Sequence, residues 1–161
     1  MTEVRFVATC SAPLDITFEY LDDHRNVTDY WHGMVSYRPV GDPEHGVGAK
    51  FQAVSKVGPS SVKSTIQTVE WERNVRVAYK SISGMDSYTS FDFAAVDDTH
   101  CTVEFRVEFQ LPGGIAGRMM EKTLEPFVST AARNTANNIS HGVAAHYASR
   151  LAALERDAAD S

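Results

Sequence analysis

The stretch that decides the fold is HCTVEFRVEFQLPGGIAGRMMEKTLEPFVSTAA, residues 100–132, because its apolar period changes partway along. Residues 100–110 alternate, which is typical of a half-buried strand. The apolar face holds Val103, Phe105, Val107 and Phe109, and the other holds Glu104, Arg106 and Glu108. After Pro112-Gly113-Gly114 the spacing becomes helical from Ile115 to about Leu154. Pro126 lacks a backbone donor, so we expect it to break or kink that helix.

Upstream of this stretch the pattern is a strand, two short helices and a series of strands. Residues 3–10 alternate as a strand, Pro13 suits the start of a helix ending near Asp22, and residues 23–32 suggest a second short helix or turn. The strands that follow are expected at 34–40, 48–57, 61–71, 75–82, 87–96 and 100–110. Short turns join them, which favours an antiparallel meander. Val69-Glu70-Trp71 suggests a bulge.

The C-terminal helix carries one apolar stripe, and the apolar face of the sheet is the only partner large enough to cover it. The expected fold class is therefore α+β, with a seven-stranded curved antiparallel sheet around a long C-terminal helix and two short helices between the first two strands. At 161 residues the chain suits one domain. We place that domain at residues 1–155 and expect residues 156–161 to be a frayed tail.

Composition excludes several classes of protein. The net charge of −6, with no Lys/Arg cluster, argues against nucleic acid as a partner. No stretch approaches the ~20 apolar residues of a membrane span, and no secretory signal is evident, so we expect a cytoplasmic protein. The histidines and the two cysteines lack metal-ligand spacing. We therefore expect no metal and no cofactor, and a monomer or homodimer.

Short motifs along nearly the whole chain carry a family resemblance. They are Ser11-Ala12-Pro13, Phe18-Glu19-Tyr20-Leu21-Asp22, Trp31, Gly46-Val47-Gly48 with Phe51, Ser83-Gly84, and Thr102-Val103-Glu104-Phe105-Arg106-Val107. With these the chain resembles the START-like, or SRPBCC, superfamily, which includes polyketide cyclases/dehydratases and birch-pollen-allergen-like proteins. The resemblance implies the helix-grip fold and a cavity for a lipid, a polyketide or another hydrophobic molecule. Only some proteins of this kind are enzymes.

Alternation sends rings and hydroxyls toward the helix and charged side chains outward, which is the chemistry of a pocket for an apolar ligand. The alternative is that the same faces make a solid core. The residues expected to contact a ligand come from both layers. They are Trp31, Phe51, Ile66, Tyr79, Phe91, Phe105, Phe109, Phe127, Ala131, Thr135 and Asn138.

Two functions remain open from the sequence. The first is binding of a hydrophobic small molecule in an internal cavity, and the alternative is a polyketide cyclase/dehydratase that closes rings or removes water. Candidates for catalysis are Tyr79 as a hydrogen-bond donor, Asn138 to orient the substrate, and Arg118 near the mouth. A third interpretation is an interaction module with a ligand-free core. Finally, antiparallel pairing of the first and last strands predicts that Cys10 and Cys101 are neighbours and reduced.

Overall fold

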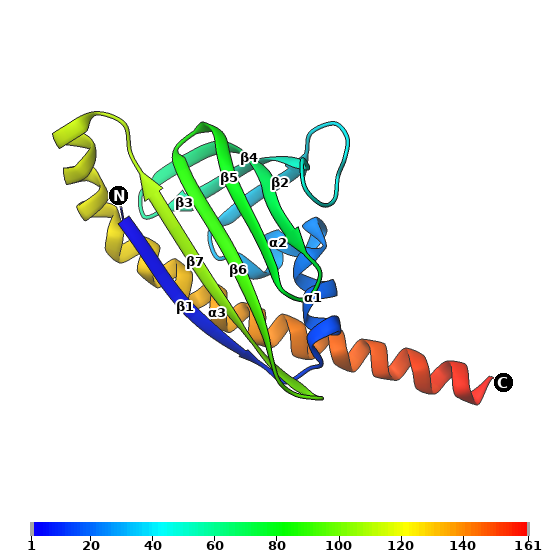
Figure 1. Cartoon of the computed structure of the whole chain (residues 1–161). Helices are drawn as coiled ribbons and strands as arrows, with labels where there is room; N and C mark the ends of the chain where they lie inside the picture. The colour runs from blue at the N-terminus through cyan, green and yellow to red at the C-terminus, as the bar shows by residue number, and fades with distance from the viewer. Residues whose placement is uncertain (1, 161) are drawn as a thin grey trace.

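A curled antiparallel sheet of seven strands wraps around one long helix in the computed structural model, which describes residues 2–160 (Figure 1). The elements follow in this order: β1 (Thr2–Cys10), α1 (Leu14–Asp22), η1 (His24–Asn26), α2 (Val27–Tyr30), β2 (Met34–Pro39), β3 (Lys50–Val57), β4 (Ser60–Glu72), β5 (Arg76–Gly84), β6 (Asp86–Asp97), β7 (His100–Gln110) and α3 (Gly114–Ala159). This is the helix-grip fold that the resemblance implied.

Strands β2 to β7 form the predicted meander, and β1 joins the sheet beside β7, so the order is β1-β7-β6-β5-β4-β3-β2. Each pair is antiparallel, and Cys10 lies directly opposite Cys101. Both thiols are free and fully buried. The prediction that the two cysteines are neighbours is therefore confirmed. The register of β4 against β5 also shifts between Thr68 and Glu70, where the sequence suggested a bulge.

The helix α3 continues through Pro126 and extends to Ala159, five residues beyond its expected end and into the segment expected to fray. Pro126 is exposed, so the carbonyl that loses its intrahelical partner can bind water. The first turns of α3 run at an angle to the rest of the helix (Figure 1). Pro126 therefore accompanies a bend and not a break.

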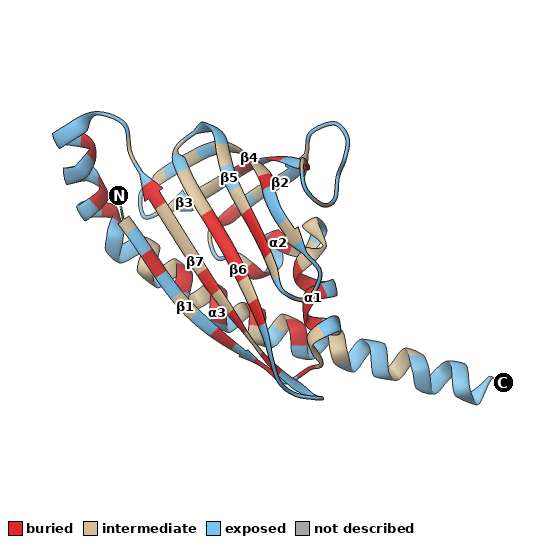
Figure 2. Ribbon diagram, viewed as in Figure 1, coloured by how far each residue is buried: buried red, intermediate tan, exposed pale blue. Residues whose placement is uncertain are grey.

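Buried residues concentrate on the concave face of the sheet and on the side of α3 that faces it, while both ends of α3 are largely exposed (Figure 2). Rings fill the middle of this interface. Phe91 contacts Phe105 at 5.1 Å between ring centroids, and Trp31 meets Phe105 edge-on at 5.2 Å. The short helices between β1 and β2 thus contribute an aromatic plug to the interior. None of the helices described is long and apolar enough to cross a membrane.

Candidate functional site

An apolar cavity lies between the first half of α3 and the β3, β4 and β7 end of the sheet. Its volume is about 90 Å³. The lining residues are Trp31, His32, Ser55, Lys56, Val57, Val62, Met85, Phe105, Val107, Phe109, Leu124, Val128, Ala131 and Ala132. Lys56 and His32 are the two ionisable residues in this lining, and the other side chains are apolar or carry a hydroxyl, so most of the wall can desolvate an apolar molecule.

Trp31 forms the inner wall of this apolar cavity. It follows the last residue of α2 in extended conformation, and its ring meets Phe105 and Phe91 edge-on at 5.2 and 6.2 Å. Gly33 then turns the chain into β2 with φ of 88°, a conformation that favours glycine. A Cβ at Gly33 would also lie 2.6 Å from the Lys56 carbonyl oxygen, so the close approach of this turn to β3 requires glycine.

Tyr30, next to Trp31, anchors the turn and does not line the cavity. Its hydroxyl donates to the Leu21 carbonyl at 3.2 Å, and its ring is 1% exposed. Asn138 on α3 donates through Nδ2 to the Tyr30 carbonyl at 3.2 Å, and Thr135 Oγ1 accepts from the His32 amide at 3.0 Å. The two polar α3 residues expected near a ligand thus hold the Tyr30–His32 segment against the helix.

A second hollow lies deeper, among Tyr37, Phe51, Thr68, Trp71 and Tyr79. Its volume of about 10 Å³ is close to the minimum for one water molecule. Burial raises the pKa of Tyr79, and the nearby Asp22 carboxylate adds to this effect. Burial also raises the pKa of Tyr37. Both phenols are therefore neutral donors, and neither hydroxyl has a hydrogen-bond partner among residues 2–160.

The deep hollow borders an open polar cleft of about 590 Å³ at the α1 end of the molecule. Asp22, at the end of α1, separates the two, and its side chain is 13% exposed. One of its oxygens accepts from the Trp71 indole at 2.9 Å, and the other contacts His45 Nε2. The Asp22 carboxylate is the charged group that adds to the raised pKa of Tyr79, and Trp71 and His45 already occupy its two oxygens.

Together these hollows replace the one roomy cavity expected from the sequence. Ligand sites usually measure a few hundred Å³, whereas the apolar cavity holds about 90 Å³ because the plug of rings divides the interior. The inward and outward faces of the strands follow the predicted alternation, since Phe51, Phe91, Phe105 and Phe109 are all buried. Alternation gives the direction of a side chain but not how much space its neighbours fill.

The predicted ligand contacts fall into groups. Trp31, Phe105, Phe109 and Ala131 line the apolar cavity, whereas Phe51 and Tyr79 line the deep hollow. Ile66 and Phe91 are buried outside both linings.

Two further predicted residues, both exposed on α3, also lie outside the described linings of both hollows. Phe127 is 45% exposed, and its ring packs on Gly58 between β3 and β4. Arg118 is exposed.

Many lining residues are absent from the predicted ligand contacts, among them Tyr37, Met85 and Leu124. Leu124 lies one helical turn before Val128, which is on the predicted stripe, so extending that stripe back through Pro126 would have found Leu124. Met85 lies between β5 and β6, and nothing in its local pattern marks it. Across residues 2–160, no three His, Cys, Asp or Glu side chains are grouped to hold a metal ion.

Comparisons with known proteins agree with this architecture. A protein of Thermus thermophilus superimposes with a TM-score of 0.77 at 17% identity, covering 89% of this chain and 98% of that one. The Zhui aromatase/cyclase from Streptomyces sp. R1128 gives 0.75 at 14% identity, covering 88% and 93%. Norcoclaurine synthase from Thalictrum flavum gives 0.66 at 14% identity, covering 90% and 87%. At these identities the likeness establishes the fold alone.

Sequence comparison is more specific about the family. No curated protein matches the chain significantly. Residues 1–140, however, match the family described as "Polyketide cyclase / dehydrase and lipid transport". That match spans the whole sheet and the first half of α3, including every residue that lines the apolar cavity. The chain therefore belongs to the polyketide cyclase / dehydrase and lipid transport family.

Proposed function

We propose that this protein binds a hydrophobic small molecule, such as a lipid, a polyketide or another aromatic compound, in the apolar cavity beneath α3. The observation that carries the proposal is the wall itself, in which Phe105, Phe109, Leu124 and Val128 face one another without an ionisable side chain between them. A void bounded by such groups forfeits dispersion contacts, and a ligand of matching polarity restores them.

A ligand larger than the present hollow requires one wall to move, and Trp31 is the wall suited to do so. It is only partly buried, and its indole has no hydrogen bond to another described residue. Tyr30 beside it is bonded to Leu21 and fully enclosed. We therefore expect ligand entry to displace the Trp31 ring from Phe105 while the Tyr30 anchor stays in place.

Titration with 1-aminoanthracene, a small apolar fluorophore, tests the proposal. The chain has two tryptophans, so Trp71→Phe leaves Trp31 as the only tryptophan reporter. We expect saturable binding of one molecule with a change in Trp31 emission. Ala131→Leu places three extra carbons in the cavity, where they take space from the ligand. Each CH₂ of the ligand that can no longer be buried costs roughly 0.8 kcal/mol of binding free energy, so binding should weaken about tenfold or more.

The matched control is Ala145→Leu, which adds the same side chain on the exposed side of the same helix. Equal weakening by both variants, or saturable binding that neither variant changes, would place the probe elsewhere and refute the proposal. Native mass spectrometry of freshly purified protein provides an independent test, because it detects a co-purified hydrophobic molecule directly.

The deep hollow favours a second candidate function, cyclisation or dehydration of a polyketide. Tyr37 and Tyr79 present two neutral donors without partners, an arrangement that suits a carbonyl or an enolate oxygen. Ring closure by aldol addition forms a carbon–carbon bond and then releases water, so no oxidant is needed. A synthetic poly-β-ketone that turns aromatic in the presence of the protein, but not of Tyr79→Phe, would establish this activity.

A further inference from the structure

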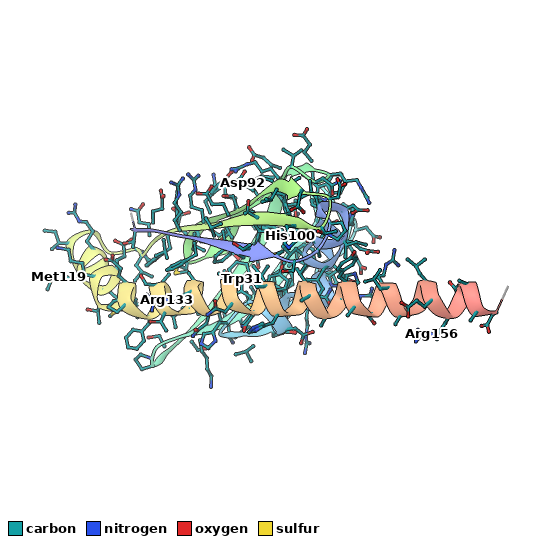
Figure 3. All side chains as sticks on the ribbon, turned by 90° about the horizontal axis from the view of Figure 1, so that it is seen from below. Trp31, Asp92, His100, Met119, Arg133 and Arg156 are labelled. Atoms are coloured by element: carbon teal, nitrogen blue, oxygen red, sulfur yellow. The ribbon has the colours of Figure 1, made fainter. Side chains whose placement is uncertain are left out.

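The first turns of α3 direct a set of apolar side chains away from the sheet. Ile115 is 72% exposed, Met119 66%, Met120 51% and Phe127 45%. We call these four residues the outer apolar face. Met119 lies at the far end of the helix from Arg156 and points away from the sheet (Figure 3). Phe127 packs on Gly58 at one edge of this face, whereas the other three side chains are more than half exposed.

The orientation of these turns is fixed from the opposite side. Gly117 packs so closely that a Cβ there would lie 2.6 Å from the Pro112 carbonyl oxygen and 2.7 Å from that of Leu111. The buried Glu121 side chain accepts from the Leu111 amide at 3.2 Å, and Leu124 is buried beside the cavity. Rotating the helix to bury Met119 would break these contacts, so the outer apolar face belongs to the folded protein.

Charge distinguishes among the possible occupants of this face. Arg118 and Lys122 are exposed on the same turns, whereas Glu125 is the only exposed carboxylate between Gly114 and Phe127. With the buried Glu121 included, the formal charges of residues 114–127 sum to zero, but the exposed side chains carry two positive charges and one negative charge on a chain whose net charge is −6. A second copy docked face to face would oppose like charges, whereas an anionic lipid surface would attract them.

The outer apolar face borders the apolar cavity. The Phe127 ring covers Gly58, where a Cβ would lie 2.9 Å from it, and Val57 beside Gly58 lines the cavity. On α3, Val128 follows Phe127 directly and Leu124 precedes it by three residues, and both line the same cavity. A surface that draws Phe127 outward would therefore loosen the contact between α3 and the β3–β4 turn beside the cavity.

We propose that the outer apolar face docks on an anionic lipid surface, with Ile115, Met119 and Met120 entering the acyl boundary and Arg118 and Lys122 contacting the head groups. Amphipathic helices bind in this way, through apolar area and cationic flanks together. Docking brings this side of the cavity to the membrane, so that a hydrophobic molecule passes between bilayer and protein without crossing water. This exchange rests on the proposed function, whereas the docking does not.

Vesicle co-sedimentation of the full chain tests the docking. Phosphatidylcholine vesicles with about one third phosphatidylserine should bind the protein, and pure phosphatidylcholine should bind it much more weakly, with affinity falling as salt rises. Lys122→Glu should reduce partitioning into anionic vesicles by at least about fivefold, since one cation near such a surface contributes about that factor. Met119→Asp should reduce it about tenfold or more.

The matched control is Leu154→Asp, which makes the same kind of change at a leucine 65% exposed at the other end of α3. Circular dichroism should show all three variants folded, because each altered side chain is exposed. Loss of partitioning in Met119→Asp and Lys122→Glu but not in Leu154→Asp supports the docking. Equal loss in all three, or no preference for anionic vesicles, overturns it.

Two further outcomes separate this inference from the proposed function. If 1-aminoanthracene binds in the cavity but the vesicles do not bind, the docking fails and the proposed function stands. If the vesicles bind through Met119 but no probe enters the cavity, the docking stands and the exchange fails with the proposed function. A concentration-dependent dimer that Met119→Asp dissociates, without vesicle binding, overturns the lipid surface in favour of a second copy.

Discussion

Replacing Gly142 by alanine tests how closely α3 approaches α1. A Cβ at Gly142 would lie 2.2 Å from the Tyr20 hydroxyl oxygen and 2.7 Å from the ring carbon that bears it. The Tyr20 ring cannot easily move aside, because it is buried with Tyr30 at 6.0 Å and His146 at 5.6 Å between ring centroids. The substitution therefore forces either the helix or the ring out of place.

Two opposing effects determine how much Gly142→Ala changes the free energy of unfolding. Alanine in place of glycine inside a helix stabilises it by about 1 kcal/mol. Overpacking a close contact costs about 1–3 kcal/mol, and a separation of 2.2 Å calls for the upper part of that range. We therefore expect Gly142→Ala to lower the free energy of unfolding by about 1–2 kcal/mol. For a chain of this size the melting temperature should fall by about 2–8 °C.

Urea unfolding followed by far-ultraviolet circular dichroism measures this change, and a second background supplies the control. Tyr20→Leu removes the hydroxyl and the ring carbon that the new Cβ would meet. In that background Gly142→Ala should be neutral or stabilising, because only the helix-propensity gain remains. A stabilising effect of equal size in both backgrounds would show that the Gly142–Tyr20 contact does not set the spacing between α1 and α3.

Three further predictions follow from burial and charge. Burial raises the pKa of Tyr79 in the folded protein above its value in the unfolded chain. This difference stabilises the fold below the unfolded pKa, and the stabilisation is lost as the pH rises through the folded pKa. The free energy of unfolding, measured from unfolding curves at a series of pH values, should therefore fall above about pH 10, and less steeply in Tyr79→Phe. Cys10 and Cys101 are fully buried, so a thiol reagent should react only at the rate of unfolding, and a rapidly labelled thiol would contradict their placement. The Arg76 guanidinium lowers the pKa of Glu70, which stabilises the fold above about pH 4.3 and loses this effect as pH falls through the folded pKa. Glu70→Gln should therefore lower the melting temperature at about pH 7, with a difference from the native protein that disappears near about pH 3.

Local patterns predicted the elements well because each depends on neighbours in sequence. The two-residue period of residues 100–110 reappears as β7, with Phe105 and Phe109 buried as expected. The pairing of Cys10 with Cys101 was also predictable, since antiparallel strands place the end of one beside the start of the other. The end of α3 was not predictable in this way, because a helix of high alanine content continues past the point where its apolar stripe weakens.

The candidate site was predicted only in part. Trp31 and Phe105 line the apolar cavity as expected, but Asn138 and Thr135 bond the backbone of the Tyr30–His32 segment. A helical stripe shows which side chains face inward but not whether a carbonyl from another segment meets them there. The two polar groups lie on the predicted face, and their partners come from residues more than a hundred positions away.

The sequence by itself determined the order of the elements, the face that each presents to the interior and the family, because period and turn chemistry are local properties. Only the tertiary structure decided how the interior is divided. Phe91 and Phe105 are cross-strand partners on β6 and β7, and the Trp31 ring reaches them from the distant turn after α2. Their meeting leaves a cavity of about 90 Å³ on one side and a hollow of about 10 Å³ on the other. Volume is what remains after all the neighbours have packed, and no single stretch of sequence carries that information.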